Sequence, residues 1–84
     1  MYKIIFDEKV VEFLEKIEKN KRIRIYNKII STKEDPFHYF ERLTWRSEYK
    51  LRVGDYRVIA DIDKTTNRIT VLVIGHRKNI YEKY

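Results

Sequence analysis

The spacing of hydrophobic residues changes about half-way along this chain of 84 residues. In the first half, apolar side chains recur every three or four residues, as they do on one face of an α-helix. In the second half, apolar and polar residues alternate, as they do along a β-strand that is buried on one face. The pattern therefore predicts helices followed by a sheet.

The first half is predicted to form a short strand and two helices. Asp7 can cap the first helix, and Asn20 can end it and cap the second. Pro36 then stops the second helix, because proline lacks a backbone donor and disfavours helical angles in the residue before it. In the second helix Ile23, Tyr26 and Ile30 share one face, with Ile25 and Ile29 beside it. The predicted ranges are a strand at residues 2–6, a helix from about Glu8 to Lys19 and a helix from Asn20 to about Lys33.

The second half reads as successive strands joined by short turns at Gly54-Asp55 and at residues 65–67. The predicted strands are Glu41–Trp45, Glu48–Val53, Tyr56–Ile62 and Arg68–Ile74. Alternation places Lys50 and Arg52 on the polar face of one strand and Arg57 on the polar face of the next. The expected fold class is α+β, a single domain of residues 1–84 with an N-terminal strand, a helical hairpin and a curved antiparallel sheet of three to four strands.

Composition excludes several classes of site. The chain has no Cys, so disulfides, thiolate metal sites and a thiol nucleophile are excluded. Its two His are far apart in the sequence with no carboxylates at ligand spacing, so neither a metal nor another cofactor is expected. No apolar run is long enough to span a membrane and the N-terminus does not resemble a secretory signal, so a cytoplasmic location is expected.

The net charge of +6 is concentrated in the second half, where residues 43–84 carry nine basic and five acidic side chains. This excess favours a polyanionic partner, either a nucleic acid or an acidic protein. A solvated surface kept soluble by lysines explains the charge equally well.

Cations and phenols recur near the ends of the predicted strands, where they can converge on one phosphate. Each also has a simpler explanation. Arg57 can pair with Asp55 or Asp61, and Arg77 can pair with Glu82 or the carboxy terminus. Tyr81 can pin the carboxy terminus to the core.

The segments LRVGDYRVIADI (residues 51–62) and VLVIGHRKNIY (residues 71–81) resemble the RelE/ParE superfamily of toxins from toxin–antitoxin pairs, in particular the RelE-like messenger RNA interferases. The resemblance implies that Arg57 and Arg77 contact the scissile phosphate. It implies that Lys50 moves a proton or stabilises charge, and that Tyr81 stacks on a base or orients the attacking group. The predicted catalytic residues are therefore Arg77, Arg57, Lys50 and Tyr81.

Four secondary candidates complete the expected site. Arg52 shares the face of Lys50, and His76 is an imidazole beside Arg77. Glu48 aligns with a second lysine of better-studied RelE proteins, and Glu41 is near a glutamate that some relatives use as base. His38 lies in an aromatic run and is expected to pack or to contact an antitoxin.

The resemblance implies a ribosome-dependent endoribonuclease that cleaves messenger RNA in the A site without a metal, by attack of the ribose 2′-hydroxyl on its own phosphate. A RelB-like antitoxin is then expected to silence it in a heteromeric complex. The sequence is compatible with two alternatives. A ParE-like toxin would inhibit DNA gyrase and cleave no RNA, and an inactive family member would serve only as a partner for an antitoxin.

Overall fold

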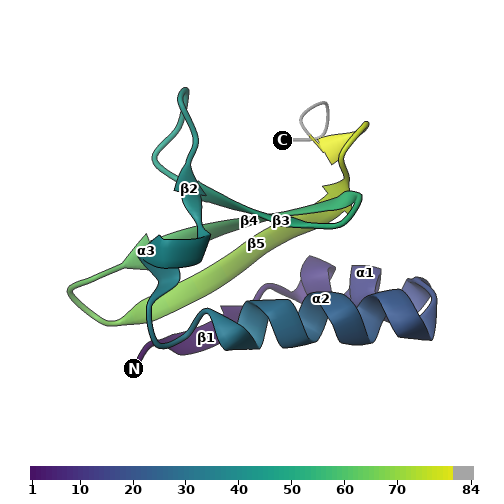
Figure 1. The fold of residues 1–84 in the computed structure, drawn as a ribbon, viewed down its shortest axis with the longest axis horizontal. Helices are drawn as coiled ribbons and strands as arrows, with labels where there is room; N and C mark the ends of the chain where they lie inside the picture. Colours follow the sequence, from purple (N-terminus) through teal and green to yellow (C-terminus); the bar gives the residue numbers. More distant parts are fainter. Residues whose placement is uncertain (81–84) are drawn as a thin grey trace.

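The structure is a computed structural model that describes residues 1–80. Its elements follow the order β1 (Lys3–Phe6), α1 (Glu8–Lys16), α2 (Lys19–Ser31), α3 (Pro36–Tyr39), β2 (Glu41–Arg42), β3 (Tyr49–Val53), β4 (Tyr56–Asp63) and β5 (Arg68–His76). Figure 1 shows two layers, with α1 and α2 together on one side of a twisted sheet. Among residues 1–80, no helix combines the length and the apolar character that a membrane crossing requires.

The sheet has five strands in the order β1-β5-β4-β3-β2. β1 pairs with β5 in parallel, whereas the other neighbouring strands are antiparallel. The α+β class and the order of elements are confirmed, but the sheet is mixed and larger than the predicted three to four antiparallel strands. The difference arises because the helical hairpin carries the chain back along the sheet, so that β1 and β5 point the same way.

The helix boundaries depend on local hydrogen bonds. Asp7 caps α1 as predicted, because its Oδ1 accepts a hydrogen bond of 3.0 Å from the backbone N–H of Lys9. The predicted cap at Asn20 is wrong, since Asn20 lies in the first turn of α2 and Glu18 occupies the N-cap position. The second helix ends earlier than predicted, where the buried hydroxyl of Thr32 donates to the Ile29 carbonyl at 2.6 Å.

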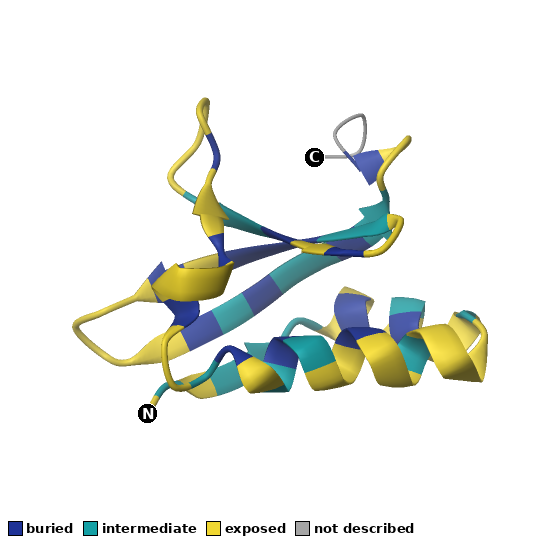
Figure 2. Cartoon of the chain, in the orientation of Figure 1, coloured by how far each residue is buried: buried dark blue, intermediate teal, exposed yellow. Residues whose placement is uncertain are grey.

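The main core lies between the helices and the sheet (Figure 2). α1 contributes Val10 and Leu14, and the buried residues of β3, β4 and β5 face them. The face of α2 that enters this core carries Ile25 and Ile29. Ile23 and Tyr26, which were predicted to share the main apolar face of this helix, are each 46% exposed.

A smaller apolar cluster covers part of the opposite face of the sheet. It consists of Leu43, Ile59 and Ile80, with Val73 packed against them. Gly75 makes room for this cluster, because a Cβ at this position would lie 2.8 Å from Cδ1 of Ile80. Ile80 therefore holds the segment that follows β5 against the sheet.

The two β-hairpin turns match their sequence signals. Gly54 adopts a φ of +58° between β3 and β4, a conformation that glycine adopts without a steric penalty. Between β4 and β5, Asp63 accepts hydrogen bonds from the backbone N–H groups of Thr65 and Thr66. These bonds hold the pKa of the Asp63 carboxyl below its usual value.

We expect Gly75→Ala to lower the free energy of unfolding by about 1–3 kcal/mol, because the new methyl group overpacks against Ile80. Adding Ile80→Val should recover part of this loss, since it removes the clashing Cδ1 atom. Urea unfolding of the two single variants and the double variant measures the coupling. Additive losses in the double variant would show that this contact is not what requires glycine.

Candidate functional site

A hollow of about 280 Å³ opens at the edge of the sheet beside the start of β2. β2 pairs only with Tyr49 and Lys50 of β3, so the remainder of the β3 edge is left uncovered by a strand. We call this site the cationic hollow. Its lining comes from α2, α3, β2, β3 and β4 and consists of Lys28, His38, Tyr39, Glu41, Lys50, Leu51, Arg52 and Arg57.

Two like charges stand directly opposite each other in this lining. Arg52 of β3 is the cross-strand partner of Arg57 in β4, and both point away from the helices. A pair of like charges at this position destabilises a sheet. Within residues 1–80, neither arginine forms an ion pair with a carboxylate. The arrangement is therefore suited to binding an anion that neutralises both arginines.

Hydrogen bonds hold the Arg57 guanidinium at the turn that joins β3 to β4. Its Nη1 donates to the carbonyls of Gly54 at 3.0 Å and Tyr56 at 2.9 Å. Arg57 is therefore not paired with Asp55 or Asp61, the partners considered from sequence. Its remaining donors are available to a ligand.

Lys50 and Glu41 provide opposite charges on neighbouring strands. They are cross-strand partners in the β2–β3 pair, and both line the cationic hollow. Glu41 is the carboxylate of the lining, so a proton acceptor lies beside the cations. Of the primary and secondary candidates, the hollow thus brings together Lys50, Arg52, Arg57 and Glu41.

Besides the core residue Leu51, three lining residues were not predicted as part of the site. The His38 and Tyr39 rings lie 4.8 Å apart and nearly perpendicular. Nζ of Lys28 lies 5.1 Å from the centroid of the Tyr39 ring. The aromatic run around His38 was the available signal for two of them, whereas no local pattern links Lys28 of α2 to β3.

Arg77 lies beside the turn rather than in the lining of the hollow. Its backbone N–H donates to the Asp55 carbonyl at 2.7 Å, and its Nε is 3.8 Å from Oδ1 of Asp55. Both side chains are more than half exposed, so the ion pair is weak. Arg77 and Arg57 therefore contact adjacent residues of one turn, Asp55 and Gly54.

The remaining candidates lie elsewhere. His76 pairs with Tyr56 across the strands, and their rings are 5.9 Å apart on the side that faces the helices. Glu48 accepts a hydrogen bond of 2.9 Å from Arg46 and does not line the hollow. Tyr81 lies outside the described residues.

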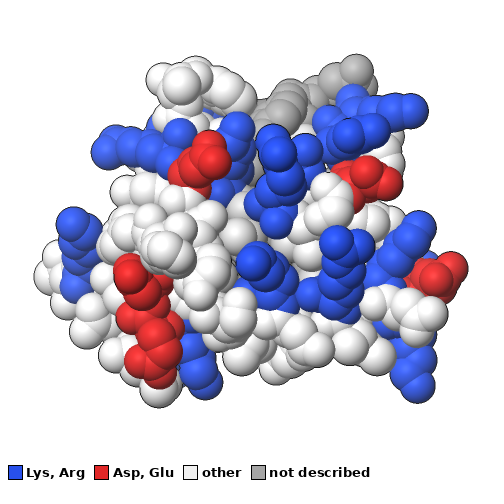
Figure 3. All heavy atoms as spheres, in the orientation of Figure 1, with Lys and Arg blue, Asp and Glu red and all other residues white. Residues whose placement is uncertain are grey.

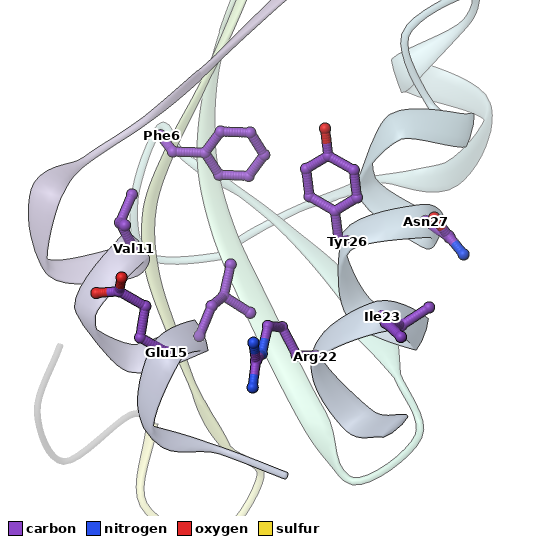
Figure 4. A pocket seen from close by; sticks show the side chains of 8 residues that line it. Phe6, Val11, Glu15, Arg22, Ile23, Tyr26 and Asn27 are labelled. Atoms are coloured by element: carbon purple, nitrogen blue, oxygen red, sulfur yellow. The ribbon is translucent and has the colours of Figure 1, made fainter. Parts of the chain in front are cut away.

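A second concavity, which we call the helical groove, has a different character. It has a volume of about 380 Å³ between α1 and α2, and Figure 4 shows side chains from both helices and Phe6 turned toward it. Val11, Ile23 and Tyr26 are each close to half exposed along this groove. Nε of Arg22 is buried there without a hydrogen-bond partner among residues 1–80.

The sequence model of the family described as the ParE toxin of the type II toxin–antitoxin system parDE matches residues 4–81. The chain belongs to this toxin family. No curated protein sequence matches the chain. The family assignment agrees with the predicted RelE/ParE superfamily.

Solved structures give the same fold. A chain of the toxin–antitoxin complex RelBE2 from Mycobacterium tuberculosis superposes with a TM-score of 0.82 at 19% identity, covering 90% of this chain and 98% of that one. The archaeal RelE–RelB complex from Pyrococcus horikoshii gives a TM-score of 0.76 at 23% identity, covering 90% of this chain and 94% of that one. The intact Escherichia coli RelBE complex gives a TM-score of 0.75 at 22% identity, covering 90% of this chain and 96% of that one. The fold is thus that of RelE toxins.

We expect Arg52→Gln to raise the free energy of unfolding by about 0.2–1 kcal/mol at low salt, because it removes the like charge opposite Arg57. The gain should shrink as salt screens the repulsion. Thermal unfolding in low and high salt measures both effects. Arg68→Gln is the matched control, because Arg68 stands opposite Asp63. If both variants lose stability to the same extent, repulsion between Arg52 and Arg57 does not destabilise the sheet.

Proposed function

We propose that the chain is a RelE-like toxin that cleaves messenger RNA, with the cationic hollow as its active site. The observation that supports this most directly is the grouping of Lys50, Arg52 and Arg57 around one hollow without acidic partners for the two arginines. Guanidinium groups match the geometry of phosphate oxygens and bind them in pairs. A single phosphodiester can therefore occupy the space between these strands.

The proposed reaction uses a nucleophile that belongs to the substrate. The ribose 2′-hydroxyl attacks the adjacent phosphorus, the bond to the 5′-oxygen breaks, and the products are a 2′,3′-cyclic phosphate and a 5′-hydroxyl. Glu41 accepts the proton of the 2′-hydroxyl, and Lys50 supplies one to the leaving oxygen. Arg57 stabilises the charge that develops on the phosphate from within the hollow, and Arg77 adds positive charge from beside the adjacent turn, where it contacts Asp55.

We further propose that cleavage takes place in the ribosomal A site in the cytoplasm. The proposed acid and base lie in an open hollow on the surface, so much of the rate must come from orientation of the substrate. A messenger held by the ribosome is already ordered. Free RNA would have to be ordered by the toxin alone and should be cut slowly.

The proposed partner that silences the toxin is a RelB-like antitoxin. The family model describes one half of a two-component system, and the similar structures from three organisms are complexes with RelB. The helical groove supports this proposal, because its half-exposed Val11, Ile23 and Tyr26 suit the apolar face of a helix. A carboxylate or carbonyl of that helix could accept from the buried Nε of Arg22.

A second candidate function follows from the family model itself, which is named for ParE. A ParE-like toxin would arrest growth by binding DNA gyrase and would cleave no RNA. The cationic hollow would then serve in binding alone.

We expect purified protein to cut messenger RNA on translating ribosomes and to leave 5′-hydroxyl ends. Arg57→Ala and Lys50→Ala should each reduce the cleavage rate by about 10²- to 10³-fold, because each removes charge stabilisation or proton transfer. Lys9→Ala is the matched control, since Lys9 lies on α1 in the helical layer. Mapping of 5′ ends measures the cleavage.

Two results would contradict the proposal. One is intact messenger beside folded protein that inhibits gyrase supercoiling, which would support the ParE-like function. The other is unchanged toxicity when Arg57 and Arg77 are both replaced by Ala.

A further inference from the structure

A second basic concavity adjoins the cationic hollow, between α2 and the open edge of β3. Its volume is about 590 Å³, and we call it the α2–β3 groove. Lys28 and Arg52 line both this groove and the hollow, so the two sites are neighbours. The full lining is Arg24, Asn27, Lys28, Ser31, Arg52, Val53 and Gly54.

The charge of the groove has one sign. Its lining contains three cations and two neutral polar side chains but no carboxylate. Within the part of the chain that the structure describes, none of the three cations forms an ion pair. On the face drawn in Figure 3, several Lys and Arg side chains gather across the middle of the molecule.

Arg24 lies close to the turn that also holds Arg57. Its Nη1 approaches to 3.1 Å of the place where a Cβ on Gly54 would be. Arg24 and Lys28 are one turn apart on α2, which places them about 6 Å apart along the helix axis. The cations of the groove therefore form a row that leads from α2 toward the hollow.

We infer that the α2–β3 groove binds the phosphodiester backbone of the RNA strand next to the linkage that is cut. This inference rests on the proposed function and extends it from the scissile phosphate to the neighbouring nucleotides. Continuity with the hollow favours the same strand as occupant. The lining favours a polyanion over an amphipathic helix, because Val53 is the one apolar side chain in it and is buried. A helix would be better accommodated by the apolar helical groove on the other side of α2.

The test uses a fluorescent, single-stranded 2′-O-methyl oligoribonucleotide of about ten nucleotides, which binds but cannot be cleaved. Arg24→Gln and Lys28→Gln should each weaken its binding several-fold and reduce the slope of log K against log salt by about 0.7. A dinucleotide that fills only the hollow should bind Arg24→Gln as tightly as the unmodified protein. Lys9→Gln and Lys16→Gln on α1 are controls with the same change in charge.

In cleavage assays on ribosomes, the loss in Arg24→Gln is expected in KM rather than in kcat, because Arg24 does not line the hollow. This readout separates a binding role from a general loss of fold or activity.

Several outcomes would overturn the inference. Equal losses of oligonucleotide binding in the α1 controls would show that the protein attracts RNA nonspecifically and that the groove has no special role. Unchanged oligonucleotide binding together with weaker ribosome binding would assign the groove to ribosomal RNA, and unchanged oligonucleotide binding with weaker antitoxin binding would assign it to a protein.

The two proposals can also fail separately. Binding that depends on Arg24 and Lys28 in a protein that cuts no messenger refutes the proposed function and supports the groove. Cleavage with unchanged KM in Arg24→Gln refutes the proposed role of the groove in RNA binding, but it does not contradict the proposed function.

Discussion

The antiparallel register of β3 and β4 is the constraint on which the candidate site depends. Side chains alternate between the two faces of a strand, so a shift of one residue would exchange the buried and exposed sets. Leu51 and Val58 are cross-strand partners buried against the helices. Burial of such side chains contributes roughly 1.5–3 kcal/mol each, whereas opposed like charges cost about 0.2–1 kcal/mol. The core therefore determines the register and forces Arg52 and Arg57 together.

The short β2 explains why there is a site at this edge at all. Before Glu41 the chain forms α3 and not a strand, so no strand pairs with the part of β3 that follows Lys50. The rest of β3 stays uncovered by a strand and is surrounded by cations of α2, β3 and β4. Open strand edges invite pairing with other chains, and charged side chains oppose such pairing. The same cations can therefore protect the edge and bind an anion.

Local sequence patterns predicted the strands and the faces on which their side chains lie. Alternation was sufficient to place Lys50, Arg52 and Arg57 on one face, because a strand has only two faces. The phase of α2 was harder to infer, since its apolar residues extend around more than one side of the helix. As a result the buried side of α2 was misplaced, and the cations Arg24 and Lys28 were not recognised as neighbours of β3.

Contacts between segments that are distant in the sequence could not be predicted, because no local pattern encodes them. The parallel pairing of β1 with β5, and the approach of Arg77 to Asp55, depend on how whole elements are arranged. His76 follows the alternation of its strand, which directs it toward the helices and away from the hollow. Its position beside Arg77 in the sequence was therefore a poor guide to its position in space.

The pairing of the first strand with the last also has a consequence for synthesis of the protein. β5 lies between β1 and β4 in the sheet, so β1 finds its partner only after residues 68–76 have been synthesised. Contacts between such distant residues form late and slowly. A nascent chain that ends before Arg68 therefore lacks the strand that joins β1 to β4, so the sheet that carries the hollow is incomplete until β5 has formed.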